Sequence, residues 1–248
     1  MGIFNFKKSH RNESNLDENL FLDDRNRDLW NSLKNCRDIK IIKGNEDNYG
    51  AYSINSNSII YVTDKIDSSS FTHELLHIYL TTKFIMPSAT LFNLINGNEI
   101  LLSIFCQNLI DHFGNVIEHK KMFPLFIKLG YKESDFLDDY YVYKMNDEEL
   151  AFIKYKFDYK NNIYYSDGIE CYIKSFFAMK CCPNTDFNYD KYYDKLKLID
   201  NNLYKILDDF MVEWDNFDIE EDENYKYRFV LSNLVYDLED WISDKNIL

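Results

Sequence analysis

Two histidines four residues apart, with a glutamate directly after the first, are the residues of this chain best suited to chemistry. They are His73, Glu74 and His77 in the stretch FTHELLHIYL. Residues four apart lie on the same face of a helix, so both imidazoles can bind one metal ion. Glu74 lies about 100° further round, beside the ligands. Such an arrangement suits a hydrolase in which two ring nitrogens hold Zn²⁺ and the carboxylate takes a proton from water.

The elements that must position these residues can be read from the surrounding pattern. A helix is expected from about Phe71 to Lys83, with N-cap side chains at Ser68–Ser70 and with Pro87 beyond its end. Three short runs before it have alternating or β-branched residues and are separated by turn-forming segments. They predict a small antiparallel sheet and read DIKIIKG, YGAYSIN and SIIYVTD. The alternative is an ordinary helix whose two histidines serve packing alone.

The remainder of the chain is predicted to be mainly helical. A long helical pattern runs from about residue 89 to His112, and Gly114 is expected to bend or break it. Beyond residue 131, apolar residues recur at three- and four-residue spacing. The fold class is therefore α+β. We place a domain boundary on charge balance, with residues 1–131 as the metal-binding region and residues 132–248 as an acidic, mainly helical region.

Composition excludes several classes of protein. The formal net charge is −14, and residues 132–248 hold 27 Asp and Glu against 14 Lys and Arg. Nucleic-acid binding needs clustered cations, so no nucleic-acid partner is expected. No apolar run of about 18 residues is present, so no membrane partner is expected either. The five cysteines lack CxxC spacing, which disfavours a thiolate metal site. We expect a cytoplasmic protein whose oligomeric state is unknown.

FTHELLHIYL resembles the active-site helix of the zincin metallopeptidases, through His73, Glu74 and His77. The resemblance implies a zincin-like fold in which a small sheet packs on that helix. It also implies a zinc-dependent peptidase whose substrate is a peptide or protein, aligned along an edge strand. In this chain SIIYVTD is the candidate for the edge.

Two histidines leave a catalytic zinc ion one protein ligand short. The metzincin continuation HExxHxxGxxH is absent, so the resemblance implies a ligand from a later helix, as in the gluzincins. Glu118 is the first choice, because Asn115-x-x-Glu118-His119 is similar to the Asn/Glu/His clusters of cytosolic bacterial zincins. His119 is the second choice, and Glu99, which follows an asparagine, is the third.

Other roles stay open for the same residues. His119 can instead act catalytically by donating a hydrogen bond to the oxyanion of the transition state. If Gly114 ends a helix, Asn115 becomes an N-cap and Glu118 the partner in a capping box, without any metal.

The resulting expectation is a zinc metallopeptidase with His73, His77 and Glu118 on zinc and with Glu74 and His119 in catalysis. The alternative belongs to another class: a regulatory or immunity-type binding protein that keeps the zincin scaffold and has no general protease activity. A purely structural metal site is the third possibility. Closed structural sites favour cysteine and have no use for Glu74.

Overall fold

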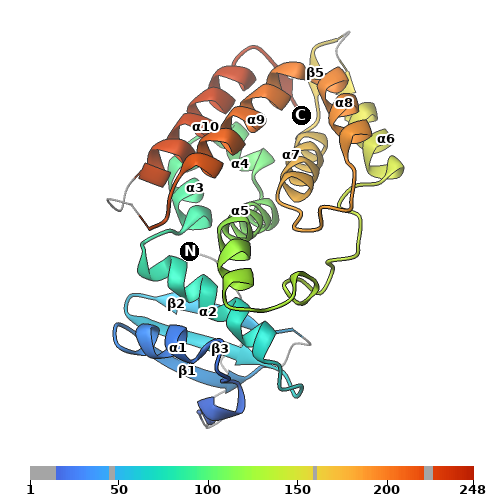
Figure 1. Ribbon diagram of the computed structural model, residues 1–248. Helices are drawn as coiled ribbons and strands as arrows, with labels where there is room; N and C mark the ends of the chain where they lie inside the picture. The colour runs from blue at the N-terminus through green and yellow to red at the C-terminus, as the bar shows by residue number, and fades with distance from the viewer. Residues whose placement is uncertain (1–14, 45–47, 159–160, 221–225) are drawn as a thin grey trace. The chain divides into compact units, whose positions relative to one another are not determined.

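A computed structural model describes residues 15–44, 48–158, 161–220 and 226–248, and it confirms the α+β class (Figure 1). Clustering of contacts divides the chain into two units. One, the sheet unit, contains the described residues up to Ile85 together with Lys120–Tyr140, and the other, the helical unit, contains Met86–His119 and Tyr141–Leu248. This division differs from the expected boundary after residue 131. The difference arises because α3 packs on α10 and α4 on α7, which joins residues 86–119 to the C-terminal helices.

The sheet unit contains a three-stranded sheet of mixed direction. Its strands are β1 (Asp38–Lys43), β2 (Gly50–Ile54) and β3 (Asn57–Val62), in the order β1-β3-β2. A tight turn with Asn55 at φ 52° joins β2 to β3 in antiparallel register, whereas β1 pairs with β3 in parallel. The prediction of an antiparallel sheet is therefore wrong. Alternation shows which side chains a strand buries, but it does not show which strand it pairs with.

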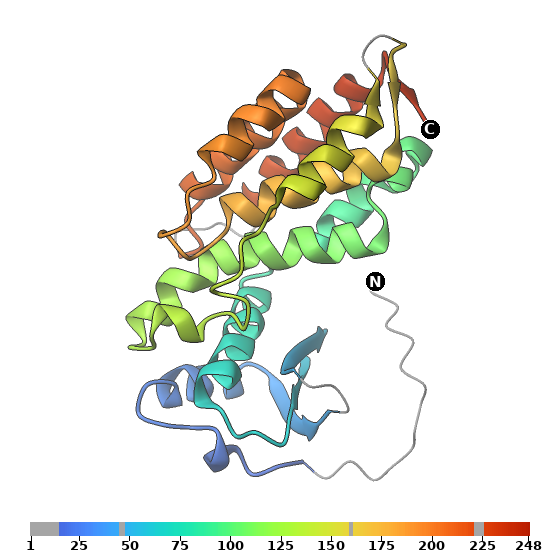
Figure 2. The same cartoon turned by 90° about the vertical axis from the view of Figure 1, so that its right-hand side faces the viewer.

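The prediction that SIIYVTD forms the edge strand is also wrong, because β3 lies between the other two strands. Its inward-facing residues and those of β1 pack against α1 (Arg27–Lys34) and α2 (Ser68–Thr82). Figure 2 shows α2 beside the sheet. The core of this unit consists of ten buried apolar side chains: Phe21, Trp30, Leu33, Ile39, Ile41, Ile60, Val62, Phe71, Leu75 and Ile78. Burial of these side chains is what fixes α2 on the sheet.

Three helices follow α2 where the sequence predicted one long helix with a break. They are α3 (Pro87–Ile95), α4 (Glu99–Ile104) and α5 (Gln107–Lys128). Gly97, at φ 111°, separates α3 from α4, while α5 runs unbroken through Gly114. A Cβ at position 114 would collide with the side chain of Ser88, so this glycine permits a close approach between helices. The capping box at Asn115 is therefore wrong, because that residue lies inside α5.

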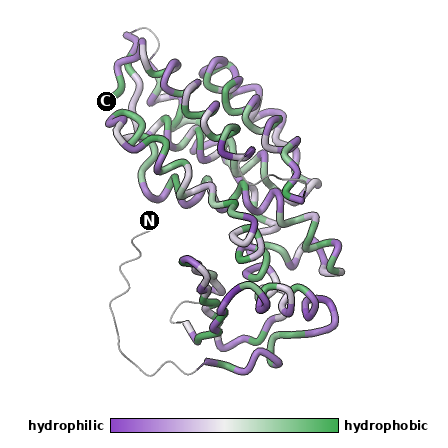
Figure 3. The backbone as a smooth tube through the Cα atoms, turned by 90° about the vertical axis from the view of Figure 1, so that its left-hand side faces the viewer, coloured by the Kyte–Doolittle hydropathy of each residue, from purple (hydrophilic) through white to green (hydrophobic). Residues whose placement is uncertain are grey.

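The C-terminal region is mainly helical, as predicted. Its helices are α6 (Asp147–Lys156), α7 (Ser166–Lys180), α8 (Asp190–Ile199), α9 (Asn201–Asn216) and α10 (Lys226–Ile242). Hydrophobic and hydrophilic segments alternate along them, as amphipathic helices require (Figure 3). Short elements complete the described fold: the 3₁₀ helices η1 (Glu18–Leu20) and η2 (Glu133–Asp135), and the strands β4 (Phe157–Asp158), β5 (Ile163–Tyr164) and β6 (Asn246–Ile247).

Within the described residues, every helix is too short or too polar to span a membrane.

Candidate metal centre

His73 and His77 lie one turn apart on α2, as their spacing predicts. Asp67, and not the expected serines, caps this helix by accepting hydrogen bonds from the backbone N–H groups of Ser69 and Ser70. The Nε2 atoms of His73 and His77 are 3.2 Å apart, and their ring centroids are 5.0 Å apart. Two nitrogen ligands at tetrahedral zinc stand roughly 3.3 Å apart, given bonds of about 2.0–2.1 Å. The pair therefore has the separation that two ligands of one metal ion require.

His119 on α5 joins the pair. One ligand atom from each of the three histidines lies within 4.8 Å of the other two, so the group can hold a metal ion. His119 is only 7% exposed. It is the last residue before the division between the two units, and α5 continues unbroken into Lys120–Lys128 of the sheet unit. We call His73, His77 and His119 the three-histidine group.

The surroundings of His73 favour its neutral form. The pKa of His73 is lowered to about 3, first because burial disfavours the charged ring and then because His77 lies nearby. A hydrogen bond with the Phe136 backbone acts in the opposite direction. The Phe136 ring also packs on the imidazole, with centroids 4.8 Å apart. At neutral pH His73 is therefore the uncharged imidazole, which is the form that binds metals.

A buried hydrogen-bond network fixes the N-terminal turns of α2 to the segment that follows α5. Asn26, fully buried, donates to the hydroxyl oxygens of Ser68 and Thr72, at 3.2 and 3.0 Å. Thr72 donates to the Tyr131 hydroxyl at 2.8 Å, and Ser68 shares a hydrogen bond with that hydroxyl at 2.7 Å. Thr72 directly precedes His73. We call these hydrogen bonds the Asn26 network. They fix the position of α2 at the residue directly before His73.

An ion pair extends the Asn26 network towards solvent. Ser68 donates to Asp23 at 2.7 Å, and Arg25 pairs with the same carboxylate at 2.6 Å. Hydrogen bonds from Arg25, and then from Ser68, hold the pKa of Asp23 well below its usual range despite partial burial. The Arg25 guanidinium lies 3.9 Å from the centre of the Tyr131 ring. Asp23 thus stays ionised and keeps its partners oriented.

The remaining predicted residues lie at defined places. Glu74 is 7% exposed on α2, next to His73. Glu118 is half-buried on α5 and Glu99 is exposed at the start of α4; among the described residues, neither belongs to the three-histidine group. Sequence reasoning missed Asn26, Tyr131 and Phe136. No spacing rule marks them, because they reach the site from separate segments of the chain.

Comparison of this chain with protein-family models, with curated proteins and with solved structures finds no match in any of the three.

Proposed function

We propose that the protein is a zinc-dependent peptide hydrolase whose metal is held by His73, His77 and His119. The three-histidine group is the observation that supports this proposal most directly. Three imidazoles on one ion, with further positions left for water and substrate, are a known ligand set of catalytic zinc. When bound, zinc lowers the pKa of a coordinated water and polarises a carbonyl oxygen.

His119 is preferred over Glu118 as the third ligand. The side chains of consecutive helical residues point in directions about 100° apart, so Glu118 and His119 face different sides of α5. The ring of His119 is the one near the α2 histidines. Under this proposal His119 no longer serves as the oxyanion donor, and Glu118 lies outside the metal's ligands.

Glu74 is the proposed general base. Its carboxylate leaves α2 beside His73 from a position that is almost fully buried. There it can accept a proton from water and then deliver it to the leaving amine of the substrate. Burial at this point excludes bulk water and makes each charge interaction stronger than it would be at the surface.

Zinc content tests the metal site. Elemental analysis of protein purified without added metal is expected to give about one zinc per chain for the wild type and for His112→Ala and Glu118→Ala. The variants His73→Ala, His77→Ala and His119→Ala are expected to lose it. His112 is the matched control because it lies on α5, as His119 does, but outside the three-histidine group. A folded wild type that binds no zinc, even after reconstitution, would overturn the proposal.

Glu74→Gln tests the chemistry separately. The variant is expected to keep its zinc and to lose hydrolysis of a proteome-derived peptide mixture by a factor of at least 10², scored by new amino termini in mass spectrometry. Full hydrolysis by Glu74→Gln would show that Glu74 is not the general base. A zinc-loaded wild type that cleaves nothing would favour the regulatory or immunity-type binding protein.

A further inference from the structure

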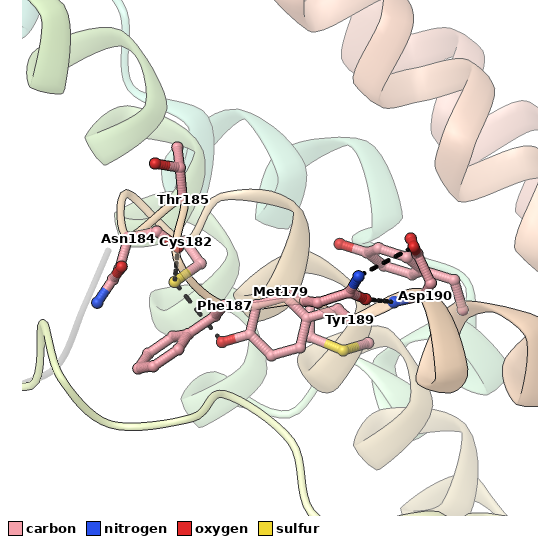
Figure 4. A pocket seen from close by; sticks show the side chains of 9 residues that line it. Met179, Cys182, Asn184, Thr185, Phe187, Tyr189 and Asp190 are labelled. Carbon is pink, nitrogen blue, oxygen red and sulfur yellow. Dashed lines mark hydrogen bonds between the residues drawn. The ribbon is translucent and has the colours of Figure 1, made fainter.

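The helical unit contains a pocket of about 310 Å³ where α7 ends and α8 begins (Figure 4). Polar side chains of its lining are paired with one another. Asn188 donates to the Asp190 carboxylate at 3.2 Å and accepts from the Asp190 backbone N–H at 2.8 Å. The Tyr189 hydroxyl donates to the Cys182 sulfur at 3.6 Å. These groups stabilise the connection between α7 and α8, and they do not indicate a ligand.

In the sheet unit, the segment that follows α5 contacts α2 at two consecutive residues, Thr72 and His73. Thr72 donates to the Tyr131 hydroxyl at 2.8 Å, and the Phe136 ring lies 4.8 Å from the His73 imidazole between centroids. Residues 131 and 136 lie on either side of η2, and all four residues belong to the sheet unit. The segment is therefore in a position to orient the first histidine of the proposed metal site.

The two ring nitrogens of His73 have different surroundings. The Nε2 atom lies 3.2 Å from Nε2 of His77, on the side that faces the second ligand of the proposed metal site. The Nδ1 atom is buried from solvent. Bulk water therefore cannot serve as its hydrogen-bond partner, and buried polar atoms of folded proteins are as a rule hydrogen-bonded within the protein.

The Phe136 backbone supplies this partner through its carbonyl. The His73 ring and the Phe136 backbone are hydrogen-bonded, and this bond raises the pKa of His73, as a bond donated by the ring does. The Phe136 N–H already donates to the Glu133 carbonyl at 3.1 Å, at the end of η2. The carbonyl is the other polar group of the Phe136 backbone, and a carbonyl only accepts. His73 therefore donates, and it donates from Nδ1 because Nε2 faces His77.

Aromatic packing holds Phe136 at this place. Its ring is 3% exposed and lies 5.2 Å from Phe123 and 5.2 Å from Phe126 between centroids, at interplanar angles of 63° and 64°. Phe126 stacks in turn on Tyr131, with centroids 4.8 Å apart. Packing against two rings restricts the movement of Phe136, so its carbonyl is kept beside His73.

We propose that Phe136 is the positioning residue of His73: its carbonyl keeps the imidazole proton on Nδ1, and its ring fixes the orientation of the imidazole, so that Nε2 faces the metal. A neutral imidazole has one donor and one acceptor nitrogen, and the acceptor nitrogen is the one that binds a metal ion. This proposal rests on the proposed function, because it takes His73 as a metal ligand. Phe136 acts through His73 and is not itself a ligand.

The position of the proton can be measured without any metal. In the ¹⁵N-labelled full chain, treated with a chelator and held at about pH 8, above the usual pKa of histidine, ¹H–¹⁵N couplings show which nitrogen of each imidazole is protonated. The His73→Ala variant assigns the signals of His73 by their disappearance. We expect the Nδ1–H form in the wild type and a mixture of both forms in Phe136→Leu, which loses the ring. The Nε2–H form in the wild type would overturn the proposal.

Zinc affinity measures the consequence for the metal site. In competition with a chromophoric chelator, Phe136→Leu is expected to bind zinc about tenfold more weakly than the wild type, because partners that orient a metal ligand strengthen metal binding. Phe21→Leu is the matched control: Phe21 is 2% exposed in the core of the same unit and packs on Phe71. This variant is expected to bind zinc as the wild type does and to keep the Nδ1–H form of His73.

The two measurements separate this proposal from the proposed function. A wild type that has the Nδ1–H form and binds no zinc would support the orientation of His73 by Phe136 and would overturn the metal site. A Phe136→Leu variant that matches Phe21→Leu in both zinc affinity and the position of the proton would show that Phe136 is not the positioning residue. Circular dichroism verifies the fold of each variant.

Discussion

A buried hydrogen-bond network accompanies the apolar core of the unit that contains α2, whereas packing of aromatic rings is prominent in the unit that contains α6 to α10. In the first, Asn26, Ser68, Thr72 and Tyr131 form one buried chain of hydrogen bonds. In the second, rings pack one on the next, as with Phe210, which lies 5.5 Å from Phe177 and 6.0 Å from Trp214 between centroids. Hydrogen bonds are directional and fix the rotation of a helix, whereas ring packing fills volume with looser angular demands. A metal site needs directional hydrogen bonds, because its ligands must point at one ion.

Removing a ring from the helical unit should have the largest effect on stability. Trp214 is fully buried, and its indole N–H donates to the Ile117 carbonyl at 3.0 Å. Trp214→Ala leaves a cavity and removes this hydrogen bond, so we expect the free energy of unfolding to fall by about 3–5 kcal/mol in urea titrations. Val212→Ala, on the exposed side of the same helix, is the control, with a change of about 0.5 kcal/mol or less. A loss below about 1 kcal/mol for Trp214→Ala would contradict the assigned role of aromatic packing.

A smaller effect on stability is expected from the Asn26 network. Asn26→Ala removes the donor to Ser68, Thr72 and the Phe21 carbonyl, which should lower the free energy of unfolding by about 1–3 kcal/mol. If the network orients α2 for metal binding, zinc affinity in competition with a chromophoric chelator should fall about tenfold as well. Asn31→Ala, on the exposed face of α1, should change neither quantity. Stability lost without any change in zinc affinity would reduce the network to a packing role.

The smallest effects concern two aspartates that cap helices in the two units. Burial alone would raise the pKa of Asp67, but hydrogen bonds from Ser69 and Lys65 outweigh it and lower the pKa. Burial raises the pKa of Asp200, and hydrogen bonds from the Leu203 backbone and the Trp241 side chain offset it only in part. Asp67 therefore contributes stability above its unfolded pKa of about 3.9, and this contribution is lost as the pH falls. The contribution of Asp200 to stability changes with pH in the opposite direction: it becomes more favourable as the pH falls, because the folded state binds the proton of Asp200 more tightly than the unfolded state.

Urea unfolding between pH 3 and pH 7 measures both aspartates. The free-energy difference between wild type and Asp67→Asn should shrink as the pH falls, whereas the difference between wild type and Asp200→Asn should shift in favour of the wild type. Parallel pH profiles for the two variants would show that the two caps have similar surroundings.

The sequence predicts the chemistry of α2 better than the position of its partners. Spacing alone places His73 and His77 on one face, and the structure brings their nitrogens together. The choice between Glu118 and His119 depends on the rotation of α5, which is set by packing of distant segments and not by local pattern. Glu74 as a base and zinc as the metal stay predictions.

Local rules failed where a residue served a tertiary contact. A glycine at position 114 favours a helix end, yet Gly114 lies inside α5. Its missing side chain leaves room for Ser88, which is a tertiary requirement that local rules do not include. The family resemblance implies an edge position for the run that contains β3, although this strand pairs on both sides. The helical character of residues 132–248 was predicted because it rests on apolar periodicity, which is a local property.

The close approach of Gly114 to Ser88 limits how this sequence can drift over generations. A methyl group at position 114 would meet the Cβ and the backbone nitrogen of Ser88, each at 3.0 Å, so shortening the side chain at 88 relieves only part of the overlap. Descendants of this chain should therefore keep glycine at 114 while exposed positions nearby vary freely. A glycine at the eighth residue of α5 is therefore expected in every relative that keeps this contact with Ser88.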